Sequence, residues 1–180
     1  MLTRQHFSLR FIATPVMIAT LALTSTSAAF AQDEKPSSAL ADVVKGVVFD
    51  PTTYAPAAIA YDATMKDWNT SQPFFQNGFV EHNRRFTVTG RPNDVAVSYI
   101  VGRNQIFKDA VGAFGVSAAQ NATSRLVERA LLARYPNHRK TVKTIGWIQR
   151  ISVASLMSCH LSAAHLRQAQ VNAQRSVSVK

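Results

Sequence analysis

The second half of the chain keeps a helical spacing of apolar residues almost without interruption, and this restricts it to a helical fold. The spacing holds over 104–134 and again over 138–174, and a turn around Pro136 separates the two stretches. We therefore expect a long pair of antiparallel helices. Gly112 and Gly115 weaken the first stretch, which could form one long helix or two shorter helices with a bend.

Stripes of mainly apolar residues run along both stretches at the 3-4 spacing that places side chains on one helix face. On the last helix the stripe comprises Ile145, Ile148, Ser152, Leu156, Cys159, Ala163 and Leu166. On the preceding helix it comprises Phe107, Ala110, Val111, Phe114 and Ala118, followed by Leu126, Val127, Ala130 and Leu131. We expect the last-helix stripe to pack against the preceding helix, which would bury Cys159 and leave it unreactive.

The first half of the chain contains shorter helical patterns and one irregular stretch. A helix is expected from Ser38 to about Val48, and a second from Pro56 until Pro73 stops it. Residues 73–103 are rich in phenylalanine and glycine, and they predict an irregular insert that forms either a β-hairpin or an ordered loop. The predicted fold class is all-α, with four or five helices.

The N-terminal 31 residues resemble an export signal. Arg4 and Arg10 precede an apolar run over 11–23, and Ala29-Phe30-Ala31 forms a small-x-small cleavage site. We expect a polar leader at 32–38, a single helical domain at 39–176 and a tail at 177–180, in a periplasmic or extracellular protein. An uncleaved membrane anchor is the alternative reading of the signal. The sixteen uncharged residues between Arg150 and Arg167 fall short of the roughly 20 needed to span a membrane, so no span is expected in the mature chain.

Charge is unevenly distributed along the chain. Residues 32–123 carry a balance of −1, whereas residues 124–180 carry +9 of the total of +10. Such a basic region attracts lipid headgroups, lipopolysaccharide or nucleic acid, although it could also be a solvated helix face that keeps the protein soluble. The candidate anion-binding residues are Arg125, Arg129, Arg134, Arg139, Lys140 and Lys143.

A second candidate site is the polar run Glu81-His82-Asn83-Arg84-Arg85 within the insert. Over an aromatic floor that includes Phe75 and Phe79, these side chains could bind an acidic ligand or exchange protons with it. The alternative is that the phenylalanines anchor the segment while the polar residues face water.

Other chemistry finds little support in the sequence. His160 and His165 are five positions apart, which separates them by about 140° around a helix, so neither a metal nor a cofactor is predicted. The chain lacks Gly-x-Ser-x-Gly, Ser-x-x-Lys and His-Glu-x-x-His. The leading hypothesis is an exported, non-catalytic protein whose basic helical hairpin associates with an anionic envelope surface. A ligand-binding protein or enzyme that uses the 81–85 run, and a subunit that self-associates through its last helix, remain open.

Overall fold

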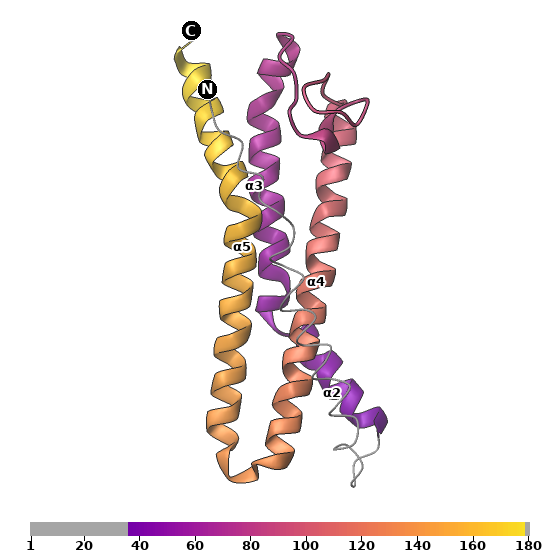
Figure 1. Ribbon diagram of the computed structural model, residues 1–180, viewed down its shortest axis with the longest axis vertical. Helices are drawn as coiled ribbons and strands as arrows, with labels where there is room; N and C mark the ends of the chain where they lie inside the picture. The colour runs from indigo at the N-terminus through magenta and orange to yellow at the C-terminus, as the bar shows by residue number, and fades with distance from the viewer. Residues whose placement is uncertain (1–35, 179–180) are drawn as a thin grey trace.

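The computed structural model describes residues 36–178, and this part of the chain is all-α, as predicted (Figure 1). The export signal predicted at 1–31 lies outside the described residues, as does most of the leader. The described residues form four α-helices, two short 3-10 turns and no strand. The helices are α2 (Pro36–Val48), α3 (Pro51–Gln76), α4 (Tyr99–Arg134) and α5 (Arg139–Ser178), and the turns are η1 (Arg84–Phe86) and η2 (Pro136–His138).

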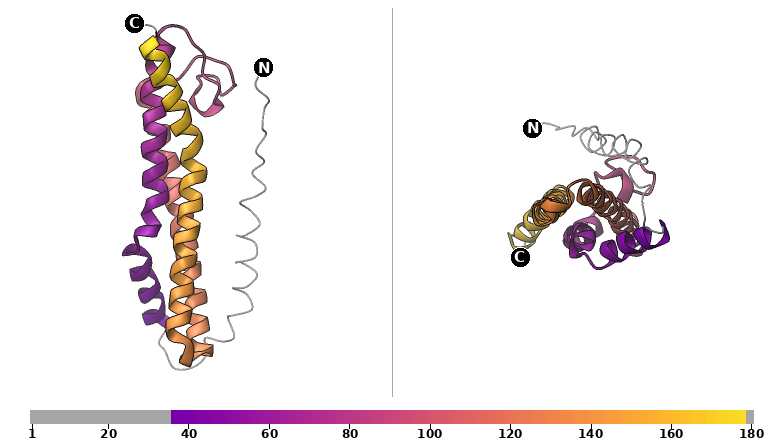
Figure 2. Two further views of the ribbon diagram at one scale, coloured as in Figure 1. Left: turned by 90° about the vertical axis from the view of Figure 1, so that its left-hand side faces the viewer. Right: turned by 90° about the horizontal axis from the view of Figure 1, so that it is seen from below.

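The three long helices lie side by side and make an elongated molecule. α5 packs chiefly along α3, α3 also packs along α4, and the short α2 lies beside one half of α4 (Figure 2). α4 is a single helix of 36 residues, so Gly112 and Gly115 do not divide it. None of the helices in the described part of the chain is both long and apolar enough to cross a membrane.

α3 ends later than its sequence predicts, because a glycine rather than a proline terminates it. Pro73 is exposed inside the last turn, and the helix continues to Gln76. Gly78 then adopts a left-handed φ of 83° and donates its N–H to the carbonyl of Phe75 at 3.1 Å. The Phe79 N–H reaches the Phe74 carbonyl at 3.1 Å, and the two rings pack edge to face at 5.8 Å. This is a Schellman motif with its hydrophobic contact.

The irregular segment between α3 and α4 therefore covers 77–98 rather than the predicted 73–103. Within it, two isolated antiparallel bridges join Glu81 to Asp94 and Thr87 to Ala96. Neither bridge extends into a strand. The segment is an ordered loop, which was one of the two readings of this region.

A compact aromatic cluster fixes the loop to the helices. Trp68 of α3, Phe86 of the loop and Ile106 of α4 are all buried, with ring centroids of Trp68 and Phe86 5.3 Å apart. Gly102 makes this cluster possible, because a Cβ at that position would lie 2.2 Å from the Trp68 indole. Phe75, which lies on α3 rather than in the loop, packs against Trp68 with ring centroids 5.6 Å apart.

Away from this cluster, polar and small side chains form much of the buried interior. Asn121 of α4 donates to the Thr53 hydroxyl at 2.6 Å, and Ser117 donates to the Thr52 carbonyl at 3.1 Å. On α5 the buried residues are Gly146, Arg150, Ala154, Ser158, Ser162, Ala169 and Asn172. Small residues let helix backbones approach closely, and the buried hydroxyls of Ser158 and Ser162 donate to carbonyls one turn earlier.

The prediction that the apolar stripe of α5 packs against α4 is wrong. Leu156 is 71% exposed, Ile145 is 60% exposed and Cys159 is also exposed. The start of the α4 stripe is also exposed, with Phe107 62% and Val111 53% exposed, whereas Leu126 further along it is half-buried. The physical reason is that the face of α5 with small and polar residues packs closely against its neighbours and places Arg150 beside two carboxylates. The apolar stripe lies on another face of the helix and is therefore exposed.

Candidate functional site

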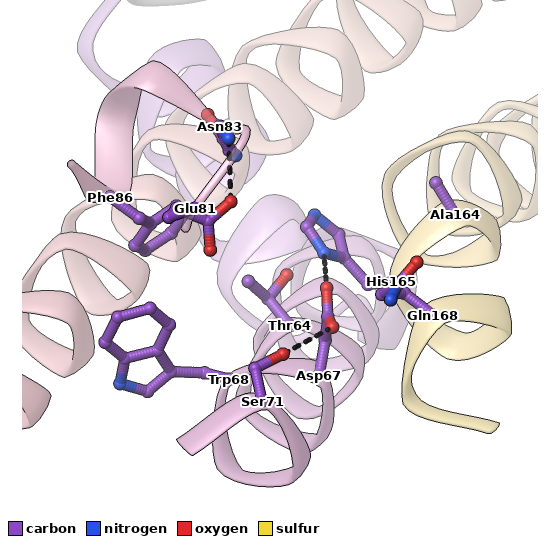
Figure 3. Close-up of a pocket in the computed structure, with 10 residues that line it drawn as sticks. All are labelled: Thr64, Asp67, Trp68, Ser71, Glu81, Asn83, Phe86, Ala164, His165 and Gln168. Carbon is purple, nitrogen blue, oxygen red and sulfur yellow. Dashed lines mark hydrogen bonds and ion pairs between the residues drawn. The ribbon is translucent and has the colours of Figure 1, made fainter. Parts of the chain in front are cut away.

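A pocket of about 230 Å³ lies at the end of the molecule that holds the aromatic cluster (Figure 3). α3, the 77–98 loop and α5 all contribute to its walls. The lining residues are Thr64, Asp67, Trp68, Ser71, Glu81, Asn83, Phe86, Ala164, His165 and Gln168. The pocket thus joins residues that are nearly a hundred positions apart in the chain.

A histidine of α5 and an aspartate of α3 form a pair at the centre of this pocket. The His165 Nδ1 atom of α5 lies 2.7 Å from the Asp67 Oδ2 atom of α3, and both side chains are largely buried. A carboxylate can only accept in such a bond, so Nδ1 carries a proton, and when the ring is neutral its Nε2 atom is an acceptor. Figure 3 shows the second ring nitrogen turned away from Asp67. The aspartate therefore fixes the tautomer of the ring.

Of the predicted 81–85 run, only part reaches this pocket. Glu81 and Asn83 line it, and a Glu81 oxygen accepts the Asn83 backbone N–H at 2.7 Å. His82 instead hydrogen-bonds Asn93, and Arg85 forms an ion pair with Asp109.

The remaining members of the predicted ligand site also lie elsewhere. Arg84 is exposed, and Phe79, which is 62% exposed, belongs to the end of α3. Arg84, Arg85, Phe75 and Phe79 therefore do not line this pocket. His82, Arg84 and Arg85 are all exposed, whereas η1 (Arg84–Phe86) ends in Phe86, which is buried in the aromatic cluster.

The pocket does not have the components of a nucleophilic or metal centre. A nucleophile would need a hydroxyl or thiol that hydrogen-bonds His165, and none of the described residues supplies one. The nearby Ser71 hydroxyl lies 3.5 Å from Asp67 instead. Within 36–178, no three or more His, Cys, Asp or Glu side chains are grouped to hold a metal ion. What the geometry offers is a concave site with oriented polar groups and an aromatic wall.

Sequence reasoning missed the Asp67–His165 pair, although one signal for it was present. Asp67 continues the α3 series Ile59, Ala60 and Ala63 at helical spacing, so a carboxylate occupies a face that is otherwise apolar. Ionised groups are rarely placed on a buried face without a partner. This pattern indicates that Asp67 needs a partner, but it does not identify His165, which is 98 positions away.

Two of the predicted anion-binding arginines lie within ion-pair distance of carboxylates of the protein. Arg125 lies 2.7 Å from Asp50, and Arg129 lies 3.6 Å from Asp42. The Asp50 pair belongs to a larger buried network, in which Arg150 lies 3.2 Å from Asp50 and 2.8 Å from Glu128. Gly146 leaves room for it, since a Cβ there would lie 2.5 Å from the Glu128 carboxylate. Two positive and two negative side chains thus join the start of α3 to α4 and α5.

Asp50 is the centre of this network and also the N-cap of α3. Burial alone would raise the pKa of its carboxyl group, but hydrogen bonds from the Thr52 hydroxyl and backbone N–H, together with Arg125, lower that pKa below its usual value. Asp50 is therefore held as a carboxylate. Arg125, which the sequence predicts to bind an external anion, is thus paired with Asp50 at the α2–α3 junction, and Arg129 lies near the exposed Asp42 of α2.

The other four predicted basic residues gather at the opposite end of the molecule from the pocket. Arg134 ends α4, and Arg139, Lys140 and Lys143 lie in the first turns of α5, all exposed. None of the four lies within ion-pair distance of a carboxylate among the described residues. We call these four residues and the intervening η2 turn the basic tip.

Large apolar side chains surround the basic tip. Tyr135 is 47% exposed at the turn, and Trp147 is 57% exposed two turns into α5. Lys140, Lys143 and Trp147 are separated by three and four residues, which places them on one side of the helix. The tip therefore presents cations and aromatic surface together.

The structure defines an elongated all-α protein with a polar pocket at one end and a basic, aromatic tip at the other. Comparison with protein-family models, curated proteins and solved structures finds no match for this chain.

Proposed function

We propose that this chain is an exported, non-catalytic protein whose basic tip associates with an anionic envelope surface. The observation that carries the proposal is the group Arg134, Arg139, Lys140 and Lys143, which is exposed and has no carboxylate partner among the described residues. Several cations at the start of α5 oppose the helix dipole, and a phosphate group would relieve that conflict. The N-terminal signal pattern supports export.

Among anionic surfaces, a phospholipid or lipopolysaccharide layer fits the tip better than nucleic acid does. Tyr135, Trp147 and Ile145 are all exposed beside the cations. Indole and phenol rings favour the boundary between headgroups and acyl chains, whereas lysines contact the phosphates above it. Nucleic-acid backbones would use the cations but would leave Ile145 in water.

The test is binding of the full chain to vesicles across a salt series. We expect sedimentation with vesicles that contain phosphatidylglycerol, weaker binding to pure phosphatidylcholine, and a loss of binding as salt rises. Trp147 fluorescence should shift to shorter wavelength on binding. Separate arms with lipopolysaccharide and duplex DNA distinguish the sources of phosphate, and failure to bind any of the three would contradict the proposal.

Removal of three tip charges gives a quantitative prediction. The triple variant Arg139→Gln, Lys140→Gln and Lys143→Gln should lose about 3 kcal/mol of binding free energy, because each cation near an anionic bilayer contributes about 1 kcal/mol. This corresponds to a loss of affinity of roughly 100-fold. The control removes three exposed cations elsewhere, at Arg91, Arg103 and Lys108. An equal loss in both variants would mean that net charge, and not the tip, governs binding.

A specific observation also favours self-association as a second function. The outward stripe of α5 exposes Ile148, Leu156 and Leu166, and no charged residue lies between Arg150 and Arg167. A twofold interface uses the same patch of each copy, so an uncharged stripe can meet itself without repulsion between like charges. Exposed apolar area of this kind is stabilised when a partner covers it. We propose a second copy of this chain as that partner.

The mass in solution tests this second function. We expect a dimer by sedimentation velocity at micromolar concentration, and a monomer for Leu156→Lys, since the variant places like charges opposite each other. Val88→Lys, at a loop residue that is 66% exposed, is the matched control and should remain dimeric. A monomeric native chain would refute the interface.

A further inference from the structure

The pocket at the far end from the basic tip has a charge opposite to that of the chain as a whole. Its ionisable lining residues are Asp67, Glu81 and His165, and neither Lys nor Arg lines it, although the chain carries a net charge of +10. We propose that this pocket binds a small organic cation, namely a primary or secondary alkylamine. Its ammonium group would lie between Glu81 and His165.

The two groups nearest the proposed ammonium site are both free to accept hydrogen bonds. One Glu81 oxygen accepts the Asn83 N–H, and the other has no hydrogen-bond partner among the described residues. His165 donates from Nδ1 to Asp67, which leaves Nε2 as an acceptor in the neutral ring. Figure 3 shows the imidazole and the Glu81 carboxylate on opposite sides of the pocket. An ammonium group has three donors and no acceptor, so it complements this pair.

Two other lining residues, Thr64 and Gln168, donate hydrogen bonds within the protein, and each keeps an oxygen that can accept one from the ammonium group. The Thr64 hydroxyl donates to the Ala60 carbonyl at 2.8 Å, and its oxygen keeps lone pairs. The Gln168 amide nitrogen donates to Asn172 at 2.9 Å, and its carbonyl oxygen has no donor from the described residues. The spare donors of the lining belong to the neutral amides of Asn83 and Gln168. An anionic ligand could accept hydrogen bonds only from these two amides, and it would be repelled by the carboxylates of Asp67 and Glu81. The lining therefore favours a cation over an anion.

The other walls suit a short hydrocarbon chain. Trp68 and Phe86 form one apolar wall, and Ala164 adds a methyl group at the rim. A volume of about 230 Å³ is enough for a short alkylamine, since one water molecule takes up about 30 Å³ in the liquid. Desolvation by the aromatic wall strengthens the ion pair that an ammonium would make with Glu81.

Calorimetric titration of the full chain with propylamine tests the proposal. Propionate and 1-propanol have the same chain length but carry a negative charge or none, and we expect both to bind at least about tenfold more weakly. Glu81→Gln should weaken propylamine binding by about tenfold or more, because it removes the charged acceptor. The control Asp62→Asn makes the same chemical change on an exposed part of α3, outside the pocket, and should bind like the native chain.

A steric variant keeps the test decisive if Glu81→Gln alters the loop. Ala164→Leu adds bulk at the exposed rim without removing any charge, so it should abolish saturable binding while the melting temperature stays unchanged. Absence of saturable propylamine binding by the native chain would overturn the proposal. Equal losses in Glu81→Gln and Asp62→Asn would also overturn it, because they would assign the effect to general surface charge. These results are independent of vesicle binding by the basic tip.

Discussion

Replacement of Arg150 by methionine is expected to lower the free energy of unfolding by about 3–5 kcal/mol, as measured by urea denaturation. The Arg150 side chain is 7% exposed and contacts both Asp50 and Glu128. Methionine fills much of the same volume, but it leaves Glu128 without its cation and Asp50 with Arg125 alone. The penalty arises from these poorly compensated buried charges rather than from lost packing.

Arg139→Met is the matched control, since Arg139 is exposed and makes no ion pair with the described residues. Its effect on unfolding should stay within about 0.5 kcal/mol. If Arg150→Met were as mild as this control, the buried network would contribute little to stability. The close packing of α5 through its polar face would then need another explanation.

The second large effect is expected for Asp50→Asn, again about 3–5 kcal/mol. Asparagine has nearly the same size and is itself a good N-cap, so the start of α3 should remain intact. What changes is charge, because Arg125 and Arg150 lose the carboxylate that lies 2.7 and 3.2 Å from them. Thr52→Ala is a useful comparison, since it removes a hydrogen bond to Asp50 but keeps the carboxylate.

Asp50 also predicts how the stability of the native chain depends on pH. Its pKa is lower in the folded state than in the unfolded chain, so the stabilisation is complete above the ordinary aspartate pKa of about 4. As the pH falls through that value and then through the lowered folded pKa, the stabilisation is lost. The difference in unfolding free energy between the native chain and Asp50→Asn should therefore shrink as the pH falls from about 5 through the lowered folded pKa. A constant difference over this range would contradict the assignment.

The helical class of this fold was predictable from the sequence, whereas the orientation of each helix about its axis was not. The apolar spacing over 138–174 and the turn at Pro136 indicate helices regardless of their neighbours. On α5, however, two faces have the same spacing: Ile145, Ile148 and Leu156 on one, and Gly146, Arg150 and Ala154 on the other. A rule that buries the more apolar face selects the first. The structure buries the second.

The site was less accessible to prediction because it depends on contacts between distant residues. Glu81 and Asn83 were identified as candidates, since they lie in a polar run among phenylalanines, and both line the pocket. His165, which lines the same pocket and pairs with Asp67, comes from α5, and its spacing of five positions from His160 gave no indication of this site. Arg125 was misassigned for a related reason, because its cationic character is visible in the sequence but its contact with Asp50 is not.

The length of α5 sets how the two ends of the molecule can work together. Twenty-five residues separate Lys140 from His165, and at 1.5 Å per residue they lie about 38 Å apart along the helix. A molecule standing upright on a lipid layer would carry its cavity at that height above the headgroups, several screening lengths away at physiological ionic strength. Lipid bound at the basic tip would then neither block nor attract a small ligand that enters the pocket. Each end could be filled, emptied or altered in evolution without a cost to the other.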